Sequence, residues 1–180
     1  NNLYIFDIAS GKTTQVTSDG KKNSIINGIT DWVYEEEFAF VRAYDWSADS
    51  KKLAYIRFDE TQVPEFSMNV FKKDLYPTVE TFKYPKAGEK NALVSLHIYD
   101  VASNAVKTVN LSNYNDFYIA RLKWTNEANV LSAQVLNRHQ DNLDLLFIDG
   151  NTAIAKVVLN EKDKAYVDVT DNLTFLKDNS

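Results

Sequence analysis

The sequence has 180 residues, a net charge of −5, no cysteine and 44% hydrophobic residues. This composition supports a sizeable core, and it excludes disulfides, thiolate chemistry and the basic surface of a nucleic-acid-binding protein. No stretch approaches the roughly 20 apolar residues of a membrane-spanning helix. The chain begins inside a strand-like pattern and stops without a finishing element, so we expect a part of a larger domain.

Residues 2–16 predict a β-hairpin, because an apolar, aromatic strand is followed by a turn at Ala9-Ser10-Gly11 and a threonine-rich strand. The same pattern returns at residues 96–109, and a looser copy follows at residues 145–150. Six residues of the first hairpin recur identically in the second: Leu3, Ile5, Asp7, Ala9, Ser10 and Val16 correspond to Leu96, Ile98, Asp100, Ala102, Ser103 and Val109.

A second repeated unit precedes each later hairpin. Residues 43–58 and 121–136 both show a strand, a Trp-Ser or Trp-Thr pair, a polar turn and another strand. Two hairpins in series make a four-stranded blade, and recurring blades indicate a β-propeller. We therefore predict that Trp46 and Trp124 lie in the core between blades, in preference to a role in stacking on a ligand.

The predicted fold is all-β: about two and a half four-stranded antiparallel blades of a larger propeller. Residues 1–18 form the outer hairpin of one blade, 19–37 a linker with a short acidic helix, 38–110 a second blade and 117–170 a third. Residues 171–180 begin a fourth. Because propellers close with 4–8 blades, the chain alone should expose blade faces and self-associate or remain partly disordered.

The second blade carries an insertion at residues 59–90, which we predict to be a long loop. Prolines and a glycine occur at Pro64, Pro85 and Gly88, where a strand would need backbone donors and side chains. Long loops in compact domains tend to be functional or interfacial. Its apolar residues are expected to pack as an amphipathic cover: Phe66, Met68, Val70 and Phe71.

The sequence NGITDWVYEEE at residues 27–37 places three consecutive carboxylates after an aromatic-rich segment. Adjacent side chains of a strand point to opposite faces, whereas on a helix they diverge by only about 100°, so we predict a short helix. Asp31 is the expected N-cap, and glutamates suit the positive end of the helix dipole. Such a group of carboxylates could bind an ammonium ion, which has three donors. The alternative is a solvated acidic helix face.

Residues 27–37 resemble the signature of the dipeptidyl peptidase IV family, the prolyl-oligopeptidase-type serine exopeptidases. Supporting segments follow in the family's order, and the resemblance covers most of residues 1–150. These segments are Trp46-Ser47, Leu53-Ala54-Tyr55, residues 58–64, residues 84–88 and Leu136-Asn137-Arg138.

The resemblance implies an eight-bladed propeller that caps an α/β-hydrolase domain, in an enzyme that releases N-terminal Xaa-Pro or Xaa-Ala dipeptides. It implies that Glu36 and Glu37 bind the free N-terminal amine of the substrate, while Glu35 braces the helix and Trp32 and Tyr34 support it. An α-amino group is largely protonated at neutral pH, which suits this role.

The resemblance also implies partners and a location for the whole protein. The expected partners are a peptide with a free N-terminus, the rest of the propeller with the hydrolase domain, and a second copy in a homodimer; no nucleic acid is expected. We expect neither a cofactor nor a metal, and a periplasmic or cell-surface location in a bacterium.

The chain contains no Gly-x-Ser-x-Gly nucleophile motif. His97 replaces Tyr4 of the first hairpin, so we interpret it as a blade side chain, and His139 as a solvated turn residue. The α/β-hydrolase domain and the catalytic triad are thus absent, and the 180 residues alone are not expected to hydrolyse peptides. Arg42 is not assigned the carbonyl-binding role that the family gives to an upstream arginine. A non-catalytic propeller, as a binding scaffold or an inactive family member, is the alternative function.

Overall fold

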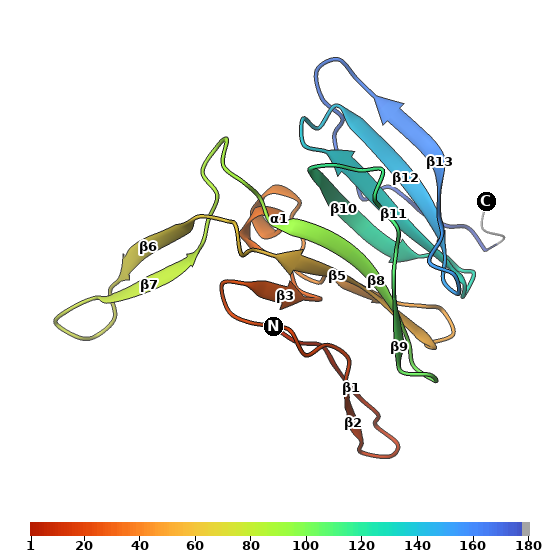
Figure 1. Ribbon diagram of the computed structural model, residues 1–180, viewed down its shortest axis with the longest axis horizontal. Coiled ribbons are helices and arrows are strands. Elements are labelled where there is room, and N and C mark those ends of the chain that lie inside the picture. Colours follow the sequence, from red (N-terminus) through yellow and green to blue (C-terminus); the bar gives the residue numbers. More distant parts are fainter. Residues whose placement is uncertain (178–180) are drawn as a thin grey trace.

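The computed structural model describes residues 1–177 and shows a chain made almost entirely of antiparallel sheets (Figure 1). The first sheet pairs two short strands, β1 (Tyr4–Phe6) and β2 (Thr13–Gln15). The last sheet has four strands in chain order: β10 (Phe117–Trp124), β11 (Val130–Asn137), β12 (Asn142–Asp149) and β13 (Ala155–Lys162). This is one complete propeller blade, as predicted.

The middle blade is organised around β5 (Lys52–Asp59), which pairs with β8 (Leu93–Asp100), itself paired with β9 (Ala105–Thr108). Two short strands share the other edge of β5. These are β3 (Ile25–Asn27), which pairs with residues 57–59, and β4 (Tyr44–Trp46), which pairs with residues 53–55. Residues 25–27, predicted as linker, are therefore the first half of the innermost strand of this blade.

The repeated hairpins have one geometry. In the first hairpin Ile5 lies opposite Thr14, and the equivalent residues Ile98 and Lys107 lie opposite each other in the second. The turns also match, because one aspartate Oδ1 accepts from both the backbone N–H and the hydroxyl of the residue three positions later. The three pairs are Asp7 with Ser10, Asp100 with Ser103 and Asp149 with Thr152. The third pair shows that residues 145–150 belong to the same repeat.

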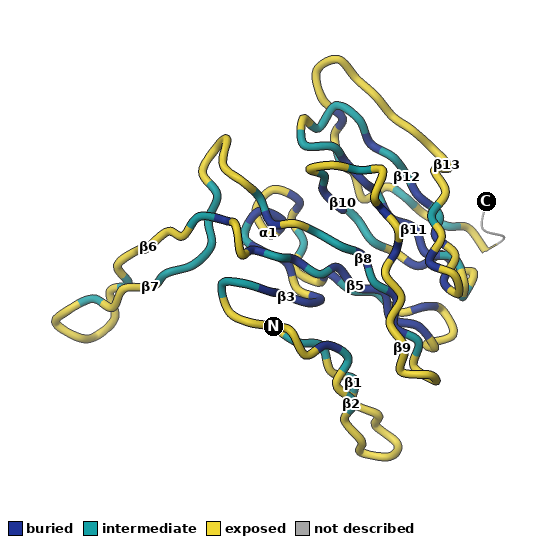
Figure 2. The backbone as a smooth tube through the Cα atoms, in the orientation of Figure 1, coloured by how far each residue is buried: buried dark blue, intermediate teal, exposed yellow. Residues whose placement is uncertain are grey.

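The core lies between the two larger sheets and continues onto the short helix α1 (Trp32–Glu37). Strand β5 is buried on both faces: Ala54, Ile56 and Phe58 face the last blade, while Leu53 and Tyr55 pack against the first hairpin. Figure 2 shows this as a dark blue band through β5 and β11. Within residues 1–177, no helix is long and apolar enough to cross a membrane.

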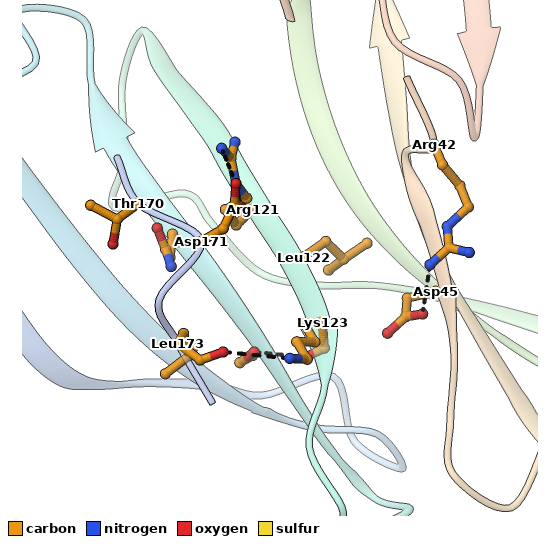
Figure 3. A pocket seen from close by; sticks show the side chains of 10 residues that line it. Arg42, Asp45, Arg121, Leu122, Lys123, Thr170, Asp171 and Leu173 are labelled. Carbon is orange, nitrogen blue, oxygen red and sulfur yellow. Dashed lines mark hydrogen bonds and ion pairs between the residues drawn. The ribbon is translucent and has the colours of Figure 1, made fainter. Parts of the chain in front are cut away.

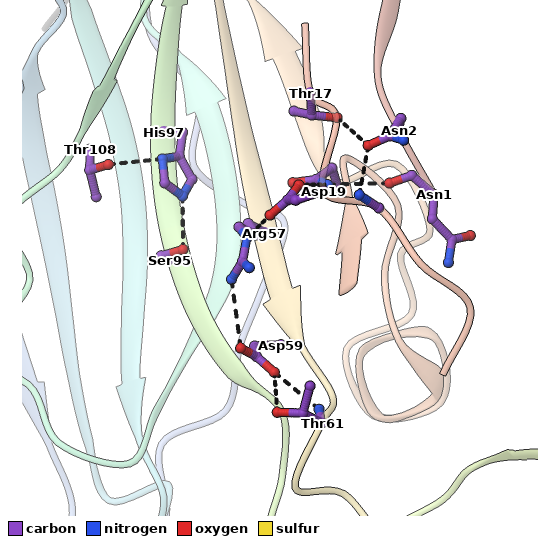
Figure 4. A network of polar contacts seen from close by, with 12 residues as sticks. Asn1, Asn2, Thr17, Asp19, Arg57, Asp59, Thr61, Ser95, His97 and Thr108 are labelled. Atoms are coloured by element: carbon purple, nitrogen blue, oxygen red, sulfur yellow. Dashed lines mark hydrogen bonds and ion pairs between the residues drawn. The ribbon is translucent and has the colours of Figure 1, made fainter. Parts of the chain in front are cut away.

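Polar contacts also tie the N-terminal segment to the middle blade (Figure 4). Asp19 accepts from Arg57 Nε at 2.7 Å and from Asn27 Nδ2 at 2.9 Å. Asn27 Nδ2 also donates to the carbonyl of Asn1 at 3.2 Å. The first hairpin and the middle blade therefore share both an apolar and a polar interface.

The two repeated tryptophans differ in burial. Trp124 is 5% exposed and its Nε1 donates to the carbonyl of Asp45 at 3.0 Å, so it lies between two blades, as predicted. Trp46 is 36% exposed, so the prediction that it is buried is wrong for the described residues. It ends β4, a short edge strand, where the indole is left half covered.

The insertion at residues 59–90 is not an irregular loop. It forms a hairpin of β6 (Glu65–Val70) and β7 (Thr78–Lys83), which projects away from both blades (Figure 1). The three prolines flank the strands, at residues 64, 77 and 85, so none interrupts the pairing. The predicted cover is also wrong, because Phe66, Met68 and Phe71 are exposed, although the Phe66 ring contacts those of Phe82 and Tyr84.

The chain beyond β13 turns back toward the inner strand of the last blade. Lys123 Nζ donates to the carbonyl of Leu173, and Asn126 Nδ2 donates to the carbonyls of Phe175 and Leu176. This segment lies where a further blade would start, although it forms no strand within the described residues. Residues 178–180, which complete the predicted start of that blade, lie outside the described residues.

Candidate functional site

The acidic helix is carried by a loop that leaves the innermost strand of the middle blade and returns to it. Gly28 N donates to the carbonyl of Ile56, and Ile56 N donates to the carbonyl of Ala43, so residues 28 and 43 meet at the same point of β5. Ala43 N also donates to the carbonyl of Gly28 at 3.0 Å. Residues 29–42 are thus an excursion with a closed neck, which we call the acidic loop.

The neck is reinforced further along the acidic loop. Ile29 and Arg42 form an isolated antiparallel bridge, Thr30 N donates to the carbonyl of Val41, and Thr30 Oγ1 donates to the carbonyl of Phe40. Gly28 has a φ of +75°, and a Cβ there would lie 2.5 Å from a Leu3 methyl. A side chain at residue 28 would therefore both strain the backbone and collide with the first hairpin.

The helix forms where the sequence predicts it. Asp31 is the N-cap, with an extended backbone and a carboxylate that accepts from Tyr34 N at 3.1 Å. The helix ends at Phe38, whose N–H donates to the carbonyl of Tyr34. Ala39 follows with a φ of 55°, the left-handed conformation that commonly terminates a helix. Local signals therefore fix both ends of this short helix.

One face of α1 is locked into the core by Tyr34, which is 2% exposed. Its ring contacts four aromatic rings, with centroid distances of 4.8–6.0 Å: Phe38, Phe40, Phe58 and Tyr118. Its hydroxyl accepts from Ile119 N at 3.0 Å. Since Tyr118 and Ile119 belong to β10, the helix is wedged between the two larger sheets.

The opposite face presents the carboxylates of Glu35, Glu36 and Glu37, all exposed. No residue among the described 1–177 forms a hydrogen bond or ion pair with these three side chains. The bracing role of Glu35 therefore stays a prediction. A rigid helix with unpaired carboxylate acceptors is suited to bind a cation that brings several N–H donors.

Trp32 at the start of α1 contacts the base of the projecting hairpin. The Trp32 ring lies 4.3 Å from that of Tyr84, at an interplanar angle of 56°. Tyr84 in turn contacts Phe66 at 5.5 Å. The predicted supporting residues thus act differently: Tyr34 fixes α1 to the core, while Trp32 connects it to the hairpin.

Two buried carboxyls, that of Asp31 at the start of the helix and that of Glu60, affect each other electrostatically. Burial raises the pKa of the N-cap Asp31 to about 6, although its hydrogen bond from Tyr34 N opposes this shift. Glu60 is 6% exposed, and burial together with the charge of Asp31 raises its pKa to about 7, against the opposing effect of Lys83. The local environment therefore favours the protonated form of both groups more than water does.

A cavity of about 350 Å³ lies between β4, β10 and the segment at residues 170–173 (Figure 3). Four of its charged lining residues form two ion pairs with each other. Arg42 Nη2 lies 3.6 Å from Asp45 Oδ1, and Arg121 Nε lies 2.5 Å from Asp171 Oδ1. Arg42 is therefore an ion-paired residue that lines the cavity.

The two histidines have structural surroundings. His97 Nε2 is 2.8 Å from Ser95 Oγ, its Nδ1 is 3.0 Å from Thr108 Oγ1, and its ring stacks on Tyr55 (Figure 4). Burial lowers its pKa to about 4. His139 is exposed in a turn, as predicted. No group of three or more potential metal ligands of the His, Cys, Asp or Glu type occurs among residues 1–177.

Sequence reasoning missed Arg121, which contacts the C-cap of the acidic helix, its ion-pair partner Asp171, and the buried carboxyl of Glu60. Arg121 is a charged residue inside the otherwise largely apolar strand Phe117–Trp124, which was a usable signal. Its contact with α1 spans more than 80 residues of sequence, so the partner could not be deduced.

Comparison with known proteins gives one consistent family. The sequence profile described as "Dipeptidyl peptidase IV (DPP IV) N-terminal region" matches residues 1–180. A probable dipeptidyl-aminopeptidase B of Talaromyces stipitatus is 36% identical over 98% of this chain and 21% of its own length. One from Aspergillus fumigatus is 36% identical over 89% of this chain and 19% of its own length.

Solved structures give the same result for the fold. The crystal structure of Porphyromonas gingivalis dipeptidyl peptidase 4 superposes with a TM-score of 0.89 at 44% identity, covering 93% of this chain and 24% of that one. A putative dipeptidyl aminopeptidase IV of Bacteroides ovatus matches with a TM-score of 0.76 at 23% identity, which supports the fold alone. The chain thus spans about a fifth to a quarter of the proteins it matches.

Proposed function

Because the chain belongs to the dipeptidyl peptidase IV family, matching that family's N-terminal region, we propose that it is the substrate-recognition propeller segment of a longer serine exopeptidase, here called the parent. In this proposal Glu36 and Glu37 bind the free N-terminal amine of a peptide. The nucleophile belongs to an α/β-hydrolase domain outside the 180 residues. The observation that carries the proposal is the set of exposed, unpaired carboxylates on a helix whose other face is immobilised by Tyr34.

An amine-binding site on a fixed helix, here called the amine clamp, would set the distance between the N-terminus of the peptide and the nucleophile. The ammonium group offers three donors, and two adjacent carboxylates supply the acceptors and the opposite charge. Held at a fixed distance from a nucleophile, the amine places one peptide bond in line for attack. The preference for dipeptides ending in proline or alanine belongs to the same proposal and follows from membership of the family.

The test is a kinetic comparison in the parent. Glu36→Gln and Glu37→Gln keep the shape of the side chain and remove its charge. We expect kcat/KM on a free-amine Gly-Pro chromogenic substrate to fall about 10- to 100-fold for each, since hydrogen bonds to charged groups contribute about 1.5–3 kcal/mol.

Glu35→Gln is the matched control, because it removes the same charge from the same exposed helix. We expect it to change kcat/KM less than threefold. Undiminished cleavage by the Glu36→Gln/Glu37→Gln double variant would reject the amine clamp. An inactive wild-type parent would support instead a non-catalytic propeller that acts as a binding scaffold.

We also propose that the parent is a homodimer and acts in the periplasm or at the cell surface of a bacterium. Both statements rest on the family. Light scattering of the purified parent and fractionation of the source cells test them; a monomer, or a parent found only in the cytosol, would reject the respective statement.

A further inference from the structure

Strand β10 departs from regular pairing at Ala120. Ile119 lies opposite Val135 and Arg121 lies opposite Gln134, so Ala120 is an extra residue with no partner on β11. The N–H of Ile119 donates instead to the hydroxyl of Tyr34 on α1. Such a bulge bends a strand and redirects the next side chain. Here the redirected side chain is that of Arg121.

The Arg121 guanidinium reaches the end of α1. Its Nη1 donates to the carbonyl of Phe38 at 2.9 Å and to that of Ala120 at 2.7 Å. Phe38 is the C-cap of the helix and follows Glu37 directly. A cation at this position also interacts favourably with the negative end of the helix dipole.

A second contact orients Arg121 from the other side. Its Nε donates to Asp171 Oδ1 at 2.5 Å, and its Nη2 lies 3.4 Å from Asp171 Oδ2. The guanidinium also lies over the Phe40 ring, 5.6 Å from the centroid. The donors of Arg121 are therefore directed at Phe38, Ala120 and Asp171, so it is suited to act on the helix and poorly placed to bind a substrate itself.

We propose that Arg121 is a positioning residue that sets the direction of Glu36 and Glu37 by holding the Phe38 carbonyl, and that Asp171 orients Arg121 for this task. The helix is short, so its carboxylates follow any shift of its end. Asp31 holds the first turn, Tyr34 the buried face and Arg121 the last carbonyl. This inference rests on the amine-binding role proposed above.

The test uses the parent and a double-mutant cycle. We expect Arg121→Gln to lower kcat/KM on the free-amine Gly-Pro substrate about tenfold, mostly through KM. In the Glu36→Gln/Glu37→Gln background the same change should cost less than twofold, because there is no amine clamp left to misplace. An equal loss in both backgrounds, or no loss in the wild type, would overturn the proposal.

Lys123→Gln is the matched control. Lys123 is on the same strand and donates to the carbonyl of Leu173 in the same segment as Asp171, but it does not contact α1. We expect its kcat/KM to stay within twofold of wild type, and a loss equal to that of Arg121→Gln would contradict positioning through the helix.

A second variant covers the case in which Arg121→Gln does not fold, as judged by circular dichroism and melting temperature. Asp171→Asn keeps the guanidinium and removes the charge that orients it, and we expect a loss of about three- to fivefold that again disappears without the glutamate pair. If the glutamate variants themselves have no effect, the amine clamp fails. If the glutamate variants have the expected effect while Arg121→Gln and Asp171→Asn leave kcat/KM unchanged, only the positioning role fails.

Discussion

The middle blade carries two excursions, and they are built in opposite ways. The acidic loop, residues 29–42, closes its neck with backbone hydrogen bonds and buries Tyr34 and Phe38 in the core. The β6–β7 hairpin projects away from the sheets, and most of its tube in Figure 2 is exposed or half-buried. A ligand site needs side chains held in one geometry. The acidic loop can therefore supply such a geometry. The hairpin contacts the acidic helix at its base, through Tyr84.

The largest effect is expected when the buried side chain that holds the acidic loop, Tyr34, is removed. We expect Tyr34→Ala to destabilise the propeller by about 3–5 kcal/mol, because it deletes a buried aromatic ring and leaves the Ile119 N–H without its acceptor. Urea unfolding of the parent, followed by tryptophan fluorescence, measures this change. Tyr76→Ala, at the exposed tip of the hairpin, is the control and should cost less than about 0.5 kcal/mol. Equal costs would remove the distinction between the two excursions.

The second test uses pH, at the point where the two excursions meet. The pKa of Glu60 is raised to about 7, so the folded state keeps a proton that the unfolded state loses near pH 4.5. The stabilisation by this proton is fully present below about pH 4.5 and is lost as the pH rises through 7.

We therefore expect Glu60→Gln to stabilise the propeller by about 1 kcal/mol at pH 8 and to have little effect at pH 4.5. Melting temperatures across this range measure the difference. Glu65→Gln on β6, whose carboxylate is exposed and lies 3.5 Å from Lys83, is the control for removing a carboxyl charge near Lys83. A benefit of Glu60→Gln that does not change with pH would argue against the protonated carboxyl.

The third test addresses the base of the hairpin. Tyr84→Ala removes the ring that lies against Trp32, and an aromatic pair contributes about 0.5–1.5 kcal/mol beyond its burial. We expect a two- to fivefold rise in KM for a free-amine substrate in the parent, because the start of α1 is less well held. Val79→Ala, in the middle of the hairpin, should leave KM unchanged; a similar rise for both variants would mean that the whole hairpin supports the site.

The smallest expected effect is a reciprocal exchange at the turns of the two excursions. Ala39 in the acidic loop has a φ of 55°, whereas the insertion has a glycine, Gly88, at a φ of 85°. We expect Ala39→Gly to stabilise by about 0.5 kcal/mol and Gly88→Ala to destabilise by about 1 kcal/mol, since left-handed conformations disfavour a Cβ. No atom lies within 4 Å of a Cβ placed at Gly88, so the change in stability there reports only the cost of the left-handed backbone conformation. Melting temperatures that move in the same direction for both variants would contradict this.

What the sequence could predict was determined by local signals. The turn of the first hairpin at Ala9-Ser10-Gly11 and the N-cap of α1 each depend on residues close together in the sequence, and the structure forms both as predicted. The repeated tryptophan marked the blades because the same local unit occurs twice. The family signature also located Glu36 and Glu37 without any knowledge of what surrounds them.

The remainder depends on contacts between distant residues. The bulge at Ala120 and the hydrogen bond from Arg121 to Phe38 join segments that local patterns do not relate. The division of one strand into β3 and β4 was hidden because the acidic loop separates the two halves. Prolines at residues 64, 77 and 85 predict a loop, but each lies just outside the paired residues, so the projecting hairpin forms.

The closed neck of the acidic loop has a consequence for how this blade could have arisen. Gly28 and Ala43 both lie opposite Ile56, so without residues 29–42 and one of these two residues β3 would continue into β4 as one ordinary strand. A single insertion into a plain strand would therefore supply the helix and leave the remaining strand pairs unchanged. The same geometry makes the segment an exchangeable cassette: related propellers could replace it with another sequence, and so acquire a different ligand, without redesigning the sheet that bears it.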